Sequence, residues 1–173
     1  MNVSDAIRSR RSVRKYKNDT VPDGHIRLIL EAAMAAPSAC NTRPWEFVVV
    51  TNEDARKKLA QVHPFAKHAA HSPAVVVICA LPETQGRVAD GFFPQDCGAA
   101  AQNILLQAAE LGYGTCWCGV YPKEKLIDAV REALDISARH GWPRYEALQN
   151  EYNLYDRAQF EEVQDLCVKE EIG

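Results

Sequence analysis

The sequence predicts a single domain that mixes α-helices with β-strands, and three observations support this prediction. The chain has 173 residues, of which 47% are hydrophobic and 25% charged, so it can bury a core of ordinary size. Two apolar runs rich in β-branched residues, 45–50 and 73–80, are typical of strands, the second of a buried central strand. Segments with a helical spacing of apolar residues lie before, between and after these runs.

Most of the expected helices have recognisable ends. Ser4 is expected to cap a short helix that starts over residues 3–7. Pro22 introduces a second helix, which is expected to stop at Ala36 because a proline follows. Asn52 is expected to cap a third helix. The remaining predicted elements are a buried helix over residues 94–112, a strand over 115–120, a helix from Pro122, and one or two acidic amphipathic helices over 144–171.

The overall charge narrows the possible partners. The net charge is −3 and the pI is near 6.0, so a general nucleic-acid binder is not expected despite a basic N-terminus. No apolar run approaches the length of a transmembrane helix, so no membrane partner is expected. The N-terminus lacks the apolar core of a signal peptide, and we therefore expect a cytoplasmic protein.

The cysteine and histidine patterns do not predict a metal site. The chain has six cysteines without a C-x-x-C pair, and most are expected to be small buried hydrophobic residues. His63, His68 and His71 are spaced by five and three residues, but no carboxylate or cysteine lies near them in the sequence and prolines interrupt the segment. We therefore expect no metal.

Three segments together suit a flat, phosphorylated aromatic cofactor. Residues 8–17 hold six cations, and guanidinium groups with a serine hydroxyl between them can bind a phosphate, the alternative being a solvated positive arm. Residues 37–44 form a proline-bracketed loop that presents hydroxyl, amide and backbone groups. The helix over 94–112 carries small residues that allow close approach of a ring or another helix, and its apolar circumference indicates a subunit interface.

Other catalytic motifs do not appear in the sequence. Neither the dinucleotide fingerprint G-x-G-x-x-G nor the P-loop is present, and the G-x-S-x-G and H-E-x-x-H motifs are missing as well. A nucleophilic cysteine is conceivable at Cys97 or Cys118, but no histidine stands in a recognisable sequence relation to either. The sequence therefore assigns no catalytic residue.

The chain resembles the FMN-dependent nitroreductase family over roughly residues 3–136. Any one of the motifs that carry this resemblance is weakly specific, but their order and spacing along the chain are distinctive. The four matching segments are RRSVRKY at 10–16, AAPSACNTRPW at 35–45, QDCGAAAQNILL at 95–106, and LGYGTCWCGV at 111–120.

The resemblance implies an α+β fold, with a central, mostly antiparallel sheet flanked by helices, in an intertwined homodimer with two FMN sites. It also implies that NADH or NADPH reduces FMN and that a nitroaromatic, quinone or similar small acceptor then takes the electrons. Some relatives of this type instead dehalogenate a substrate or fragment their flavin. The implied cofactor-binding residues are Arg10, Ser12 and Arg14 at the phosphate and ring edge, with Arg11 a weaker candidate; Pro37, Ser38, Ala39 and Asn41 from the other subunit; and the backbone of Cys118 and Gly119.

The chain departs from the family pattern after Ser137. The usual strand, turn and C-terminal basic residue are not evident there, and Arg157 is one candidate substitute for the missing cation. We therefore divide the chain into an FMN-binding domain over residues 1–137 and a divergent helical extension over 138–173. The alternative function is a non-catalytic flavin-binding or scaffold dimer that lost turnover through this altered C-terminus.

Overall fold

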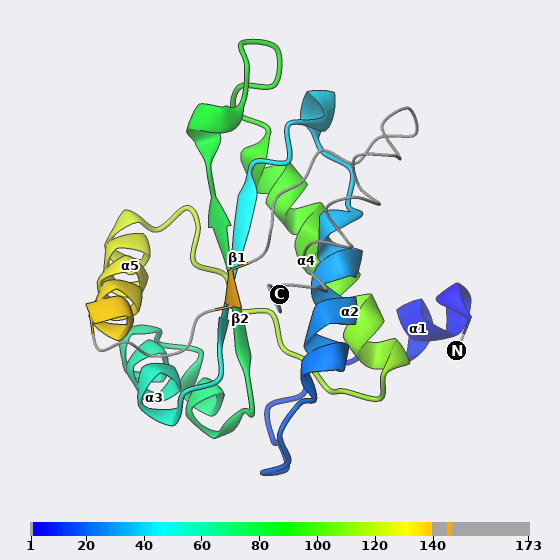
Figure 1. Ribbon diagram of the computed structural model, residues 1–173, viewed down its shortest axis with the longest axis vertical. Helices are drawn as coiled ribbons and strands as arrows, with labels where there is room; N and C mark the ends of the chain where they lie inside the picture. The colour runs from blue at the N-terminus through cyan, green and yellow to red at the C-terminus, as the bar shows by residue number, and fades with distance from the viewer. Residues whose placement is uncertain (1, 140–144, 147–173) are drawn as a thin grey trace, which may run out of the picture.

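The computed structural model describes residues 2–139 and 145–146, and it confirms the α+β class (Figure 1). A sheet lies between two pairs of helices, with α2 and α4 on one face and α3 and α5 on the other. The elements are α1 (Val3–Ser9), α2 (Asp23–Met34), η1 (Ala39–Asn41), β1 (Trp45–Val50), α3 (Glu53–Val62), η2 (Lys67–His71), β2 (Val75–Ala80), η3 (Pro82–Thr84), α4 (Phe93–Glu110), α5 (Glu124–Arg139) and β3 (Tyr145–Glu146).

The sheet is antiparallel and has the strand order β2-β1-β3. β1 pairs with β2 from Trp45 opposite Ala80 to Val50 opposite Val75, so β1 is the central strand of the described sheet. The prediction that residues 73–80 form a buried central strand was wrong: β2 is at the edge of the described sheet, and its residues are half-buried or exposed, because an apolar run does not fix the number of neighbouring strands. The predicted helix was also wrong at residues 145–146, which pair with β1 as β3; the rest of that predicted segment lies outside the described residues.

Alternating side chains of β1 divide the core into two layers. Trp45, Phe47 and Val49 are almost fully buried and pack with residues of α2 and α4. Val48 and Val50 point to the opposite face, where they pack with residues of α3 and α5. This period-two pattern is what a strand covered on both faces requires, since successive side chains point to opposite faces.

The helix boundaries follow the predictions closely, with two corrections. Asn52 caps α3 as predicted, because its side chain accepts a hydrogen bond from the Ala55 N–H. The first helix is capped by Asn2 rather than Ser4, since the Asn2 amide oxygen accepts from Asp5. α2 ends at Met34, two residues before the predicted stop. Within the described residues, no helix is long and apolar enough to cross a membrane.

Residues 115–120 do not form the predicted strand. Their one recorded bridge is parallel and joins Thr115 to Ser12. β-propensity favours an extended backbone here, but it does not supply a pairing partner, which depends on the tertiary fold. The proposed domain boundary at residue 137 stays a prediction, and α5 runs across it from Glu124 to Arg139.

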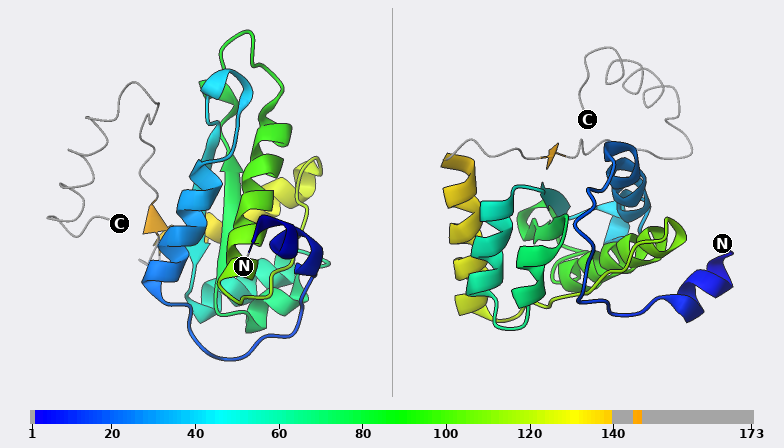
Figure 2. Two further views of the ribbon diagram at one scale, coloured as in Figure 1. Left: turned by 90° about the vertical axis from the view of Figure 1, so that its right-hand side faces the viewer. Right: turned by 90° about the horizontal axis from the view of Figure 1, so that it is seen from below.

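α4 is a long helix that runs along the molecule beside α2 (Figures 1 and 2). Its first turn lies beside the loop that contains η1, and its last turn leads to the segment that pairs with residue 12. A helix of 18 residues rises by about 27 Å. The loop therefore lies at the first turn of α4, whereas Ser12 pairs with Thr115 just beyond its last turn. Residues 117–121 run back along the helix, since Trp117 contacts Gly98 and the ring of Tyr121 lies 5.5 Å from that of Phe93.

Candidate functional site

The first group of predicted site residues, which we name the cationic end, consists of residues 10–16 and residues 113–119. The N–H of Val13 donates to the carbonyl of Thr115 at 2.8 Å, beside the bridge from Ser12. Gly114 makes this close approach possible, because a Cβ on it would lie 2.7 Å from the Val13 side chain. The arginine segment is therefore held against the chain that leads to Cys118.

The arginines of the cationic end differ in what they contact. The Arg11 guanidinium donates to the carbonyls of Arg8 and Arg10, which engages it with its own backbone. Arg10 is half-buried, whereas Ser12 and Arg14 are exposed. In the described part of the chain, neither Arg10 nor Arg14 forms an ion pair with a carboxylate. Their charges can therefore bind an external anion.

Arg14 also lies close to a half-buried cluster at the cationic end. Burial raises the pKa of Tyr16 to about 12, with further contributions from Cys116 and Cys118. Burial, followed by the neighbouring Cys116, raises the pKa of Cys118 to about 11, while the Arg14 charge opposes this rise. Burial and the Arg14 charge lower the pKa of His68. The environment therefore favours neutral forms of all three groups near neutral pH.

Gly119 is fixed through its backbone carbonyl. Nε2 of the buried His63 lies 3.0 Å from the Gly119 oxygen, and Nδ1 of His63 accepts from the Phe65 N–H at 3.2 Å. Because Nδ1 is an acceptor, the neutral ring carries its proton on Nε2 and donates it to Gly119. Sequence reasoning considered His63 only as a metal ligand and missed this positioning contact.

The second group, which we name the loop end, consists of residues 37–44 and the first turn of α4. Three of its residues that are not glycine have positive φ: Cys40 at 52°, Asn41 at 54° and Arg43 at 46°. The Arg43 N–H donates to the Ser38 hydroxyl at 2.9 Å, and this contact helps to hold the unusual backbone. Such conformations cost roughly 1–3 kcal/mol each and persist where neighbouring contacts enforce them.

Asp96 anchors the loop end to α4, and sequence reasoning did not single it out. Its carboxylate is buried and accepts from the Ala39 N–H at 3.0 Å and from the Gln85 amide at 3.1 Å. Gln85 in turn accepts from the Phe93 N–H at the start of α4. The position of Asp96 in the first turn of a helix, two residues after Pro94, was the available signal.

The structure thus brings the predicted site residues together in two sets. One set holds Arg10, Arg11, Ser12 and Arg14 beside the chain of Cys118 and Gly119; the other holds Pro37, Ser38, Ala39 and Asn41 in the loop (Figures 1 and 2). Pro37 and Asn41 are exposed, and Ser38 and Ala39 are half-buried. The arginine set is paired with Thr115 beyond the last turn of α4, and the loop set is hydrogen-bonded to Asp96 in its first turn.

The cysteines are less buried than the sequence predicts. Cys40 is exposed, and Cys79, Cys97, Cys116 and Cys118 are half-buried. Cys167 lies outside the described residues. Burial raises the pKa of Cys97 to about 11, with Asp96 and Cys79 adding to the effect. A thiol with a raised pKa is a weak nucleophile at neutral pH, so this pKa does not favour the conceivable catalytic role of Cys97.

The antiparallel sheet covered by helices, and the cationic segment paired with residue 115, agree with the fold that the nitroreductase resemblance implies. Comparison with known proteins identifies the same family. The model of the nitroreductase family matches residues 7–63 and 62–145. The chain belongs to the nitroreductase family. A Methanothermobacter thermautotrophicus protein, provisionally named an NADH dehydrogenase/NAD(P)H nitroreductase, is 42% identical over 136 residues, which cover 79% of this chain and 70% of that protein.

Solved structures agree with this assignment. An FMN-dependent nitroreductase from Clostridium difficile superposes with a TM-score of 0.71 at 28% identity, covering 88% of this chain and 93% of that one. A provisionally named nitroreductase from Desulfovibrio desulfuricans, solved in complex with FMN, gives a TM-score of 0.66 at 26% identity, covering 89% and 93%. The resemblance stated from the four sequence motifs is therefore confirmed.

Proposed function

We propose that the protein is an FMN-dependent oxidoreductase that passes reducing equivalents from NADH or NADPH to a small acceptor such as a nitroaromatic or a quinone. The single observation that carries the proposal is the pairing of Ser12 with Thr115, which aligns Arg10 and Arg14 beside the segment of Cys118 and Gly119. Family membership, with an FMN complex among the similar structures, supports the choice of cofactor.

The residues of the cationic end fit a flavin phosphate. Arg10 and Arg14 have no carboxylate partner within residues 2–139, and the exposed Ser12 hydroxyl lies between them in sequence, so the three offer charge-assisted donors to a dianion. In this proposal Arg10, Ser12 and Arg14 bind the phosphate and ring edge, and Arg11 contributes less because its guanidinium already contacts backbone carbonyls. Bound FMN supplies the hydride chemistry, and these residues bind and orient it.

The proposed active form is a homodimer. In this proposal Pro37, Ser38, Ala39 and Asn41 reach the cofactor of the partner copy, because they lie beside the first turn of α4 whereas Ser12 pairs with Thr115 beyond its last turn. α1 lies at the edge of the molecule and exposes Val3 by 72% and Ile7 by 54%. Burial of such apolar surface stabilises an association between chains.

The first experiment follows flavin absorbance in the purified protein under anaerobic conditions while NADH and then NADPH is added. Rapid bleaching, followed by recovery when a quinone or nitroaromatic is added, supports the proposed oxidoreductase. Flavin that stays bound and oxidised indicates the non-catalytic carrier instead. Protein that remains colourless after incubation with FMN would overturn both.

A double variant tests the assigned phosphate ligands. Arg10→Ala with Arg14→Ala removes two charge-assisted contacts and is expected to weaken FMN binding by several kcal/mol, about 1.5–3 kcal/mol for each contact. Arg87→Ala with Arg131→Ala removes two exposed arginines elsewhere and is the matched control for net charge. Unchanged flavin retention in the Arg10/Arg14 variant, measured by fluorescence titration, would contradict this phosphate site.

A further inference from the structure

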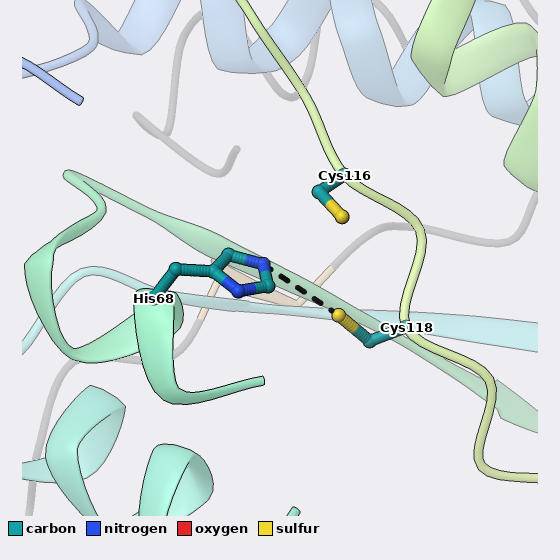
Figure 3. Close-up of side chains that lie close together, drawn as sticks. All are labelled: His68, Cys116 and Cys118. Carbon is teal, nitrogen blue, oxygen red and sulfur yellow. Dashed lines mark hydrogen bonds between the residues drawn. The ribbon is translucent and has the colours of Figure 1, made fainter. Parts of the chain in front are cut away.

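The structure places one histidine and two cysteines together, although they are some 50 residues apart in the sequence. His68 lies on η2, and Cys116 and Cys118 lie on the extended segment after α4 (Figure 3). One ligand atom from each residue falls within 4.8 Å of the others, and all three residues are half-buried. Sequence spacing did not predict this cluster, because the tertiary fold alone brings the cysteines to the histidine.

The spacing of the donor atoms suits a tetrahedral metal ion. Cys118 Sγ and His68 Nε2 are 3.7 Å apart. At Zn–S and Zn–N bonds of about 2.3 and 2.0–2.1 Å, a tetrahedral angle separates sulfur and nitrogen by about 3.6 Å. An ion between these two atoms therefore requires little movement of either side chain.

The backbone around the cluster also suits a closed set of ligands. Cys116 and Cys118 are separated by one residue on an extended chain, so both side chains leave the backbone on the same side. Cys118 packs against the buried cluster of Ala60, Ala66 and Ala69, which holds η2 to α3. The nearby hydrogen bond from His63, at the C-cap of α3, to the Gly119 carbonyl holds the segment of Cys118 beside α3.

We propose that His68, Cys116 and Cys118 bind one Zn²⁺ ion per chain, with the fourth coordination position open to water or another ligand. Two thiolates and one imidazole form a donor set that zinc accepts in proteins. The charges balance as well: the dication and two thiolates sum to zero, so the nearby Arg14 guanidinium is not repelled by the complex. Binding releases two thiol protons and leaves the oxidation state of every atom unchanged.

The proposed ion links η2 to the segment that carries Cys118 and Gly119, at the cationic end. No flavin is needed to hold the ion, because each ligand belongs to this chain, but the ion lies beside the Cys118 and Gly119 backbone that the FMN proposal also uses. The proposal also departs from the expectation of no metal, which considered His63, His68 and His71 without the two cysteines.

The test uses the full chain after reduction and removal of metal, once without flavin and once after incubation with FMN. Titration with Co²⁺ is expected to give one ion per chain and the intense near-ultraviolet absorption of thiolate-to-cobalt charge transfer. Zn²⁺ is then expected to abolish this absorption at one equivalent. These spectra report thiolate ligation in the unaltered protein, so they do not depend on a variant that folds.

Matched variants assign the ligands. Cys116→Ser, Cys118→Ser and His68→Gln are each expected to weaken Zn²⁺ binding at least about 100-fold in competition with a chromophoric chelator. Cys40→Ser, Cys97→Ser and His71→Gln are expected to bind as the parent does. The proposal would be overturned by well below one ion bound per chain or by a cobalt spectrum without thiolate bands. It would also be overturned if the control variants lost as much Zn²⁺ affinity as the ligand variants, or if Cys116 and Cys118 stayed joined by a disulfide after reduction.

Discussion

The two ends of the molecule hold their candidate site residues by different means. At the cationic end, a backbone hydrogen bond from Val13 to Thr115 and the close approach to Gly114 position the arginines. At the loop end, side chains hold the loop, because the Asp96 carboxylate and the Ser38 hydroxyl accept hydrogen bonds from backbone N–H groups.

This difference determines how each end responds to substitution. The close approach at Gly114 leaves no room for a side chain, so a larger residue there is expected to disrupt the cationic end. A loop held by a buried carboxylate depends on that one acceptor, so removing it leaves a donor unpaired. Different single substitutions are therefore expected to disrupt the two ends.

The largest effect is expected for Gly114→Val. The new side chain meets Val13 at a contact that would already be 2.7 Å for Cβ alone, so the paired segments must separate. We expect a loss of about 3 kcal/mol in the free energy of unfolding, at the upper end of overpacking costs. Urea unfolding at one fixed protein concentration measures this loss.

Gly86→Val is the matched control for this substitution, because nothing lies within 4 Å of a Cβ at Gly86. We expect this variant to unfold within about 0.5 kcal/mol of the parent. Equal stability of the two valine variants would show that the cationic end is not closely packed at Gly114.

An intermediate effect is expected for Asp96→Ala. The Ala39 N–H and the Gln85 amide lose their shared acceptor in a buried place, which costs about 2 kcal/mol of unfolding free energy. Asp96→Asn retains one oxygen that can accept from Ala39 and is expected to lose less. The same unfolding measurement ranks the three proteins, and an alanine variant as stable as the asparagine variant would contradict the anchoring role of Asp96.

Features fixed by local sequence were predictable, whereas features that depend on pairing were not. The predictions of the strand Trp45–Val50 and of the Asn52 cap are confirmed, because β-branching and capping act over a few residues. The bridge between Ser12 and Thr115 and the strand at residues 145–146 depend on partners far along the chain, so local patterns missed them.

The candidate site shows the same limit. The arginines, the loop and the Cys118 segment were recognised as motifs, since their residue types are distinctive in sequence. The link from Asp96 to Ala39 spans 57 residues, and the contact between His68 and Cys118 spans 50. Hydrophobic periodicity and spacing carry no information on such contacts, because they arise when α4 and η2 pack into the fold.

The smallest effect on the fold is expected from chemical labelling of the two cysteines near the loop end, which compares their reaction rates. Cys40 is exposed in η1, whereas Cys97 is half-buried directly after the first turn of α4. Burial first, and then Asp96 and Cys79, raise the pKa of Cys97 from 9.0 to about 11. At pH 8 the thiolate fraction of Cys97 is therefore roughly 100-fold below that of a thiol with a pKa of 9.0. Cys40 is expected to react with iodoacetamide first, without loss of the fold.

Mass spectrometry of digested protein, sampled during labelling, measures both rates separately. The rate at Cys97 is expected to rise about tenfold per pH unit until the pH approaches 11, because the reactive thiolate becomes more abundant over that range. In Asp96→Asn the nearby negative charge is gone, so labelling of Cys97 at pH 8 is expected to be faster than in the parent. If Cys97 reacted as fast as Cys40 in the native protein at pH 8, the loop end would be open down to the first turn of α4, and the anchored loop described above would be wrong.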